Sequence, residues 1–442
     1  MNLLEKIQGT VLPPAGAAAT VSYESQVTND EIRDTNSMSD EKLYIVLMGL
    51  PARGKSTLGI RLREAFHKDH IHTRIFNNGN LRRIYRPLAE TSCAEFYSPN
   101  NPAAVELRNK FARMNMERAK AYLRNSGQVA ILDATNAGRS RRMMIENYLN
   151  NHPLLFIECV NEDEDILNLS ILEKTKLPEF NHLECQKAEA EFLKRIEYYK
   201  MIYTPLKTER NYVRLDSLQN RIIEEKHTDA ISLYARLRDY LVTDEVKNLF
   251  LIRHTQTEYN IEDRIGGDPG LTRKGKEQAE ALGHFFAKKR ISYIFTSSKL
   301  RTKRTAEAIA RMQEACRIIA LKEFDEINAG VCEEMTYAEI EKKMPQIFRD
   351  REANKYAYAY PEGESYAMMK PRIEEGIKKS FFLNRRADNI MIVGHQAVNR
   401  LILSHFLYRR DVDVPYIYIP QDRFYNIVST QNKKLFELRK YD

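Results

Sequence analysis

Residues 49–57 place two glycines, a lysine and two hydroxyl residues at the spacing of a loop that binds phosphate groups. These residues read GLPARGKST and fit the pattern GxxxxGK[ST]. They follow the apolar run 43–48 and precede a helical pattern over about residues 54–66. In such a loop the backbone N–H groups turn toward a polyphosphate, Lys55 can reach the outer phosphates, and Ser56 can ligate Mg²⁺. A glycine turn that merely caps a structural helix is the alternative, and the strand before the loop together with the helix after it disfavours that alternative.

Asp133 and a set of arginines supply the charges that a phosphate-transfer site needs. Asp133 ends the short apolar run 130–132, which suits the carboxylate that holds Mg²⁺ beside such a loop. A buried strand can end in Asp without any function, so it is the pairing with the loop that favours the metal role. Guanidinium groups match phosphate oxygens bidentately, and the candidates are Arg82, Arg83, Arg139, Arg141, Arg142 and Arg195. For Arg141 and Arg142 we favour solvated helix faces.

A second set of groups lies at predicted strand ends in the other half of the chain. Arg253 and His254 follow the apolar run 249–252, His395 follows residues 392–394, and Arg301 and Glu326 lie between them. An imidazole can attack phosphorus directly, while a second imidazole and two arginines stabilise charge on the equatorial oxygens and a carboxylic acid protonates the leaving alcohol. A histidine after a strand is more often structural. The order of all these groups, each at a strand terminus, nevertheless predicts a phosphohistidine site.

Two alternating series of strands and helices must position these groups. Such alternation predicts parallel sheets flanked by helices, and therefore two α/β domains. Residues 1–41 mix a Pro- and Ala-rich stretch with polar residues and predict a mobile N-terminal extension. We expect a first α/β domain over residues 42–246 and a second over residues 247–442. The expected strands are residues 43–48, 129–132, 154–160, 248–252, 291–296 and 389–393.

Composition narrows the class of protein. The 442 residues include 43% hydrophobic residues, 17 Gly, 15 Pro and 5 Cys, which excludes disordered, collagenous and disulfide-framework proteins. The apolar runs are far shorter than the ~20 residues of a membrane-spanning helix, and the first residues show no leader pattern. Widely spaced cysteines without a CxxC pair indicate reduced thiols and a cytoplasmic protein. The net charge of +8 suits anionic small molecules as well as nucleic acid.

These residues resemble the bifunctional 6-phosphofructo-2-kinase/fructose-2,6-bisphosphatase family over about residues 42–430. GLPARGK and AGVCEEMTY, residues 329–337, are the most specific motifs, and residues 76–83, 133–136, 192–197, 264–268 and 395–398 also match. The resemblance implies a P-loop kinase domain over residues 42–246, which transfers the γ-phosphate of ATP to the 2-hydroxyl of fructose 6-phosphate. It implies a histidine phosphatase domain, similar to phosphoglycerate mutase, over residues 247–442. That domain would hydrolyse fructose 2,6-bisphosphate through a phosphohistidine.

The resemblance also implies the residues of the kinase site. ATP is expected at Gly49, Leu50, Pro51, Ala52, Arg53, Gly54, Lys55, Ser56, Thr57, Leu169 and Lys174. Mg²⁺ with ATP is expected at Ser56 and Asp133, and Asp133 could instead serve the attacking hydroxyl. Fructose 6-phosphate is expected at Arg82, Arg108, Thr135, Arg139, Lys174, Arg195 and Tyr199. Lys174, expected to bridge the phosphates, is placed by counting back without a gap from Phe192, and Lys176 is the alternative.

In the phosphatase domain the resemblance implies that His254 is phosphorylated, that Glu326 donates the proton and that His395 assists. Fructose 2,6-bisphosphate is expected at Arg253, Asn260, Gly266, Arg301, Tyr337, Arg351, Lys355, Tyr366, Gln396 and Arg400, and no metal is expected there. The implied partners are small-molecule substrates and a second copy of the chain in a homodimer, with neither nucleic acid nor a membrane.

Some residues depart from the family pattern and keep other hypotheses open. The departures are Leu81, Ala137, Gly138, Asn161, Thr255, Ala357 and Ala359. Those around the kinase sugar site leave open a phosphatase whose P-loop domain only binds ATP as a regulatory module. A basic P-loop protein that binds nucleic acid is a third hypothesis, and it leaves the second set of groups unexplained.

Overall fold

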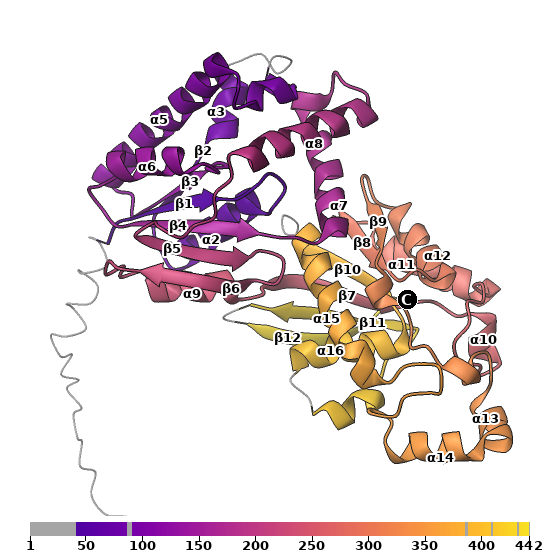
Figure 1. Ribbon diagram of the computed structural model, residues 1–442. Helices are drawn as coiled ribbons and strands as arrows, with labels where there is room; N and C mark the ends of the chain where they lie inside the picture. Colours follow the sequence, from indigo (N-terminus) through magenta and orange to yellow (C-terminus); the bar gives the residue numbers. More distant parts are fainter. Residues whose placement is uncertain (1–40, 86–90, 385–387, 408–409, 431–432, 442) are drawn as a thin grey trace, which may run out of the picture. The chain divides into compact units, whose positions relative to one another are not determined.

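Two six-stranded sheets, each flanked by helices, organise the part of the chain that the structure describes (Figure 1). The computed structural model describes residues 41–85, 91–384, 388–407, 410–430 and 433–441. The predicted N-terminal extension, apart from residue 41, lies outside the described residues. Among the described residues, no helix combines the length and the apolar character needed to cross a membrane.

The first sheet has the strand order β2-β3-β1-β4-β5-β6. Neighbouring strands are parallel as far as β5, and β6 pairs antiparallel at the edge. The strands are β1 (Leu43–Met48), β2 (Thr73–Asn77), β3 (Val129–Asp133), β4 (Leu154–Val160), β5 (Asn211–Asp216) and β6 (Arg221–His227).

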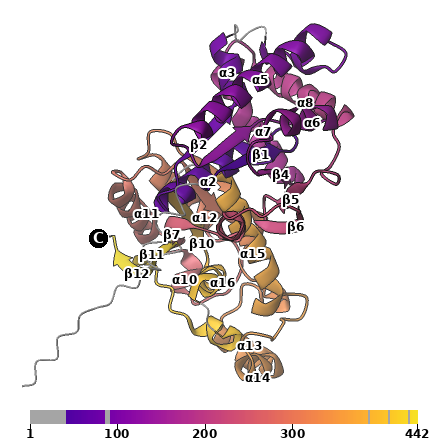
Figure 2. The ribbon, with the colours of Figure 1, turned by 90° about the vertical axis from the view of Figure 1, so that its left-hand side faces the viewer.

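The central strand β1 is buried at every residue because helices cover both faces of its sheet (Figures 1 and 2). Its odd-numbered residues pack with α2 (Lys55–Lys68) and α9 (Tyr234–Val242). Its even-numbered residues pack with α5 (Pro102–Arg124) and α6 (Arg139–Tyr148). This two-sided cover explains why the strand reads as an uninterrupted apolar run. The remaining elements are α3 (Asn78–Tyr85), η1 (Ala94–Tyr97), α7 (Glu164–Thr175), η2 (Pro178–Phe180) and α8 (Cys185–Met201).

The second sheet has the strand order β12-β11-β7-β10-β8-β9. Strands β7, β10, β8 and β9 are parallel neighbours, whereas β11 runs antiparallel to both β7 and β12. The strands are β7 (Val246–Arg253), β8 (Tyr293–Thr296), β9 (Arg317–Ala320), β10 (Asn389–Gly394), β11 (Arg423–Ser429) and β12 (Lys434–Lys440).

Helices also cover both faces of the second sheet. One hydrophobic cluster joins the sheet to α15 (Tyr366–Leu383) and α16 (Gln396–Leu407), and another joins it to α11 (Arg273–Phe286) and α12 (Leu300–Ala310). The remaining elements are α10 (Glu258–Ile261), η3 (Lys322–Phe324), η4 (Gly330–Cys332), α13 (Tyr337–Lys343), α14 (Pro345–Ala353) and η5 (Asp411–Tyr416). The predicted fold class, two α/β domains built on largely parallel sheets, is confirmed.

The parallel registers bring the predicted functional groups to the carboxyl edges of the sheets. In the first sheet Leu47 and Asn77 both lie level with Asp133. In the second sheet Gly394 lies level with Arg253. Ligands of open α/β sheets bind at these edges, so each sheet carries one candidate site.

Candidate functional sites

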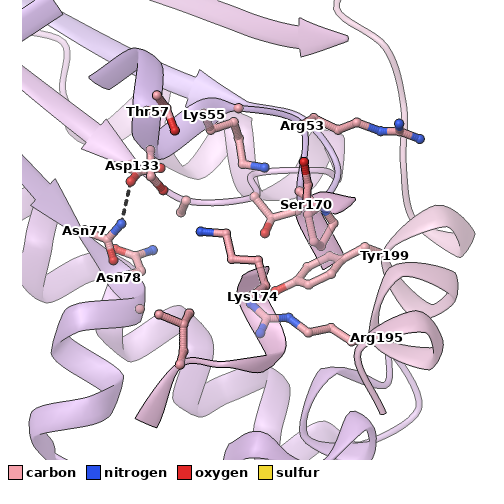
Figure 3. Close-up of a pocket in the computed structure, with 18 of the residues that line it drawn as sticks. Arg53, Lys55, Thr57, Asn77, Asn78, Asp133, Ser170, Lys174, Arg195 and Tyr199 are labelled. Carbon is pink, nitrogen blue, oxygen red and sulfur yellow. Dashed lines mark hydrogen bonds between the residues drawn. The ribbon is translucent and has the colours of Figure 1, made fainter. Parts of the chain in front are cut away.

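A cavity of about 1050 Å³ opens at the carboxyl edge of the first sheet. Figure 3 shows side chains from the start of α2, from the ends of β2 and β3, and from α7 and α8 turned toward this space. The lining includes the predicted residues Pro51, Ala52, Arg53, Gly54, Lys55, Ser56, Thr57, Arg82, Arg108, Asp133, Thr135, Lys174, Arg195 and Tyr199. The groups predicted from separate motifs therefore meet in one place.

The loop after β1 folds tightly because of its glycines. Gly49 has φ of 134°, and a Cβ there would lie 2.5 Å from the carbonyl oxygen of Cys159. Gly54, with φ of 84°, caps α2 without a side-chain hydrogen bond. Gly54 and the first residues of α2 line the cavity, so the N–H groups of this helix N-terminus are available to bind an anion. Lys55 begins α2, and its Nζ donates to the Leu50 carbonyl oxygen at 2.6 Å. Burial lowers the pKa of Lys55 to about 8, and the nearby Asp133 opposes that shift.

Asp133 fits the expected magnesium ligand. The residue is 3% exposed at the end of β3, and the side-chain amide of Asn77 donates to one of its carboxylate oxygens (Figure 3). Ser56 lines the same cavity. Carboxylate and hydroxyl oxygens are hard ligands of the kind that Mg²⁺ prefers, and Mg²⁺ sites of this type add phosphate oxygens and water to one or two protein ligands. The residues present therefore fit Mg²⁺ bound together with ATP.

Of the two candidates for the phosphate-bridging lysine, Lys174 reaches the cavity. It projects from α7 into the space that Lys55 also faces (Figure 3). Lys176, the alternative, keeps half of its side chain exposed and pairs with Glu173 at 3.2 Å. The ungapped count thus leads to a side chain that lines the cavity, and its role as the phosphate-bridging lysine stays a prediction.

One buried carboxylate, which sequence reasoning missed, holds three of the cavity's arginines. Glu179 is 2% exposed and forms ion pairs with Arg82, Arg83 and Arg195. Burial and the neighbouring guanidinium groups lower the pKa of Arg82 to about 9. Three cations against one anion leave positive charge for a phosphorylated substrate, while the ion pairs fix the guanidinium planes.

The arginines at the start of α6 are arranged differently from the prediction. Arg139 does not line the cavity, because its guanidinium donates to Glu146 and Glu209, both at 2.9 Å. Arg141 does line it, close to Tyr199 and Arg108. Arg142 is 1% exposed and pairs with Glu209 at 2.7 Å. The interpretation of Arg141 and Arg142 as solvated helix faces is therefore wrong.

Three predicted ATP residues also lie away from the cavity lining. Leu169 packs against the hydrophobic cluster formed by α15, α16 and the second sheet. Gly49 and Leu50 lie in the same loop but do not line the cavity. The Leu50 carbonyl oxygen accepts the hydrogen bond from Nζ of Lys55.

The second site forms around two histidines at the ends of neighbouring parallel strands. His254 follows β7 and His395 follows β10, and their ring centroids are 5.3 Å apart. The backbone N–H of His254 donates to the Gly394 carbonyl oxygen at 2.9 Å, and this hydrogen bond joins the ends of the two strands. Both imidazoles are buried.

Backbone contacts define the protonation of His254. Its Nδ1 lies 2.9 Å from the Thr255 carbonyl oxygen, which can only accept, so Nδ1 carries the proton and Nε2 keeps a lone pair. Burial and the charges of Arg301 and Arg253 hold the pKa of His254 well below 6.5. Burial and Arg301 lower the pKa of His395 in the same way. Both imidazoles are thus neutral at pH 7, and Nε2 of His254 is a competent nucleophile.

These lowered pKa values predict that the fold loses stability in acid. Below pH 6.5 the unfolded chain takes up protons on histidines that the folded chain keeps neutral. Stability is therefore fully present above pH 6.5 and falls by about 1.4 kcal/mol per pH unit for each such histidine, down to its folded pKa. The His395→Asn variant should lose less unfolding free energy than the wild type between pH 6.5 and 5.5 in denaturant titrations. Equal losses would contradict the lowered pKa.

Arginines and a carboxylate surround the histidine pair. Arg301 donates to the Gly267 carbonyl oxygen at 2.7 Å, and Arg253 donates to the Ile419 carbonyl oxygen at 3.2 Å. Burial lowers the pKa of both arginines, and the nearby Glu326 opposes the shift in each. Backbone N–H groups, among them that of Gln396 at 3.1 Å, donate to the Glu326 carboxylate. The predicted proton donor thus lies beside the predicted phosphoryl-binding cations.

The predicted sugar-binding residues form two smaller groups. Arg351 donates to the hydroxyls of Tyr337 and Tyr360 at 2.9 and 2.7 Å, and Tyr360 was not predicted. Arg400 donates to the Tyr366 hydroxyl at 2.9 Å.

The other predicted residues of the phosphatase site are placed as follows. Lys355 pairs with Glu352 at 3.0 Å. Gly266 has φ of 72°, and a Cβ there would clash with the Glu333 carboxylate. Asn260 closes a capping box with Thr257 at the start of α10.

Comparison with known proteins identifies the family of each half of the chain. The family model of 6-phosphofructo-2-kinase matches residues 31–255, and that of the histidine phosphatase superfamily (branch 1) matches residues 249–440. The 6-phosphofructo-2-kinase/fructose-2,6-bisphosphatase 1 of Mus musculus is 35% identical over 392 residues, which cover 85% of this chain and 79% of that protein. Form 3 from Rattus norvegicus is 34% identical over 397 residues, which cover 87% and 69%. The resemblance seen in the motifs is confirmed, and the chain belongs to the 6-phosphofructo-2-kinase/fructose-2,6-bisphosphatase family.

Proposed function

We propose that this chain is a bifunctional enzyme. Its first domain makes fructose 2,6-bisphosphate from ATP and fructose 6-phosphate, and its second domain hydrolyses fructose 2,6-bisphosphate to fructose 6-phosphate and phosphate. The observation that carries the proposal is the convergence of two separate sets of groups, one around Lys55 and Asp133 and the other around His254 and His395. The first set suits transfer from a nucleotide, and the second suits transfer to imidazole.

In the kinase site, catalysis depends on alignment and charge. The loop N–H groups and Lys55 bind the ATP phosphates, while Lys174 neutralises charge that develops between donor and acceptor. The arginines held by Glu179 bind the sugar phosphate. Mg²⁺, held by Ser56 and Asp133, would neutralise the nucleotide phosphates. The free oxygen of Asp133 can alternatively accept the proton of the 2-hydroxyl group.

In the phosphatase site, Nε2 of His254 attacks the phosphorus of the 2-phosphate. The N–P bond forms as the bond between phosphorus and the sugar oxygen breaks, and Glu326 gives its proton to that oxygen. Arg253, Arg301 and His395 donate to the equatorial oxygens. Water then attacks the phosphohistidine and loses a proton to the Glu326 carboxylate, which releases phosphate and restores the neutral imidazole.

The decisive experiment measures ATP-dependent formation of fructose 2,6-bisphosphate by the His254→Ala variant. This variant removes the nucleophile that consumes the product, so the product should accumulate linearly with time at saturating fructose 6-phosphate. Lack of product would favour the alternative, a phosphatase whose P-loop domain only senses ATP. The wild type, assayed beside it in both directions, shows whether one preparation carries both activities.

The proposal has two further parts. We place the protein in the cytoplasm, on the basis of its widely spaced cysteines without CxxC pairs, and we expect a homodimer, as the family resemblance implies. Sedimentation of the full chain tests the dimer.

A further inference from the structure

Gln421, which follows η5 and precedes β11, connects two parts of the phosphatase site. Its Nε2 donates to the His254 carbonyl oxygen at 3.1 Å and to Oδ1 of Asn260 at 2.8 Å. One side chain therefore joins the main chain of the nucleophile to a predicted substrate ligand. Neither contact was predicted from the sequence, in which Gln421 lies 167 residues from His254.

Backbone groups fix the orientation of both amides. The His254 carbonyl can only accept, so the Gln421 atom that faces it is the amide nitrogen. The Thr257 backbone N–H can only donate, so the Asn260 atom 3.0 Å from it is Oδ1. That oxygen also accepts from the Thr257 hydroxyl at 3.0 Å. Three donors thus saturate Oδ1 of Asn260, and its Nδ2 group is left to donate to a phosphoryl oxygen.

The backbone of the same segment orients two arginines of the site. The Ile417 carbonyl oxygen accepts from Nε of Arg400 at 2.9 Å. The Ile419 carbonyl oxygen accepts from Nη1 of Arg253 at 3.2 Å. Residues 417–421 therefore contact both cations and Asn260, and a shift of this segment would displace all three.

The segment is itself held by the end of the described chain. The Tyr441 hydroxyl donates to the Gln421 carbonyl oxygen. The Tyr441 ring is 8% exposed and packs in the hydrophobic cluster that contains Phe250 and Ile252 of β7. The strand that delivers His254 and the segment that carries Gln421 are thus fixed to the same core.

We propose that Gln421 is a positioning residue of the phosphatase reaction, which holds the Asn260 amide with its N–H bonds toward the transferring phosphoryl group. This inference rests on the proposed hydrolysis of fructose 2,6-bisphosphate. The Gln421 contact with His254 is to the main-chain carbonyl oxygen and not to the reacting imidazole. Gln421 therefore acts on the phosphoryl group through Asn260, and its contribution must vanish when Asn260 is removed.

A double-mutant cycle of Gln421→Ala and Asn260→Ala tests the inference in the full chain. Each single variant should lower kcat/KM for hydrolysis by roughly 10- to 30-fold, the scale of one or two hydrogen bonds to a charged group. The double variant should be no slower than Asn260→Ala alone, because the effects of coupled residues do not add. Multiplied losses in the double variant, or an unchanged rate in Gln421→Ala, would overturn the inference.

Two controls separate positioning from folding. The kinase rate of each variant, measured on the same preparation, should stay within about twofold of the wild type. Gln346→Ala, which removes an exposed amide on α14 that donates to Asp350, should leave hydrolysis unchanged.

Gln421→Glu supplies a second variant: its carboxylate cannot donate to Oδ1 of Asn260, so hydrolysis should fall at least as far as in Gln421→Ala. A wild type without hydrolysis would refute the proposed function instead.

Discussion

The Lys55→Met variant is expected to synthesise fructose 2,6-bisphosphate about 1,000-fold more slowly than the wild type while it hydrolyses the same compound at an unchanged rate. Lys55 is the cation at the start of α2, where the helix N-terminus and the loop N–H groups meet. Its ammonium is desolvated, which strengthens its interaction with a phosphate oxygen. Methionine keeps the length and the apolar stem but removes the charge on which the loose transition state depends.

Both rates should be measured on one preparation, with labelled ATP for synthesis and labelled fructose 2,6-bisphosphate for hydrolysis. Lys176→Met is the matched control, because it removes the charge of a lysine that lies in the same predicted domain but pairs with Glu173 at the surface. That control should keep both activities. Parallel loss of synthesis and hydrolysis in Lys55→Met would contradict two separate sites.

The sequence predicted the buried parallel strands well because burial on both faces leaves a clear signal. The expected strand over residues 43–48 coincides with β1, and the one over residues 154–160 coincides with β4. Strands with exposed residues carry no such run of apolar residues. β6 exposes most of its residues, and β12 is only half-buried, so neither was predicted.

Motifs located most of the candidate residues but could not place those on helix α6. Arg139 and Arg141 are two positions apart, which puts their side chains on nearly opposite faces of a helix. Only one of them can face the cavity, and the sequence does not show which. In the structure Arg141 lines the cavity, whereas Arg139 forms ion pairs with Glu146 and Glu209.

Residues that position others left no signal in the sequence. Glu179 lies 97 residues from Arg82, in a short turn after Pro178, and Gln421 lies in an irregular segment. Tertiary packing determines which residues they contact. A local sequence pattern does not reveal a contact between residues that lie so far apart along the chain. The motifs therefore gave the groups that are predicted to bind substrate, whereas the supporting contacts required the fold.

The His254→Ala variant is expected to form no phosphoenzyme. Nε2 of His254 is the nitrogen whose lone pair is available, because the Thr255 carbonyl oxygen holds the proton on Nδ1. His395, whose Nε2 lies 2.8 Å from the Ser297 hydroxyl, is expected to stabilise the transferring phosphoryl group rather than to accept it. Brief incubation of the wild type with 2-[³²P]-labelled substrate should trap label that is labile in acid and stable in base. The variant should trap none, and any residual hydrolysis must then proceed by direct attack of water.

His284→Ala is the matched control, because it removes an exposed histidine from α11 of the same domain. It should trap as much label as the wild type, and both variants should retain the wild-type rate of synthesis. Acid-labile label on the His254→Ala chain would assign the nucleophile to another residue, and label that survives acid would exclude a phosphohistidine altogether. Because the two sites use different groups, loss of the imidazole at position 254 should convert the enzyme into a net producer of fructose 2,6-bisphosphate.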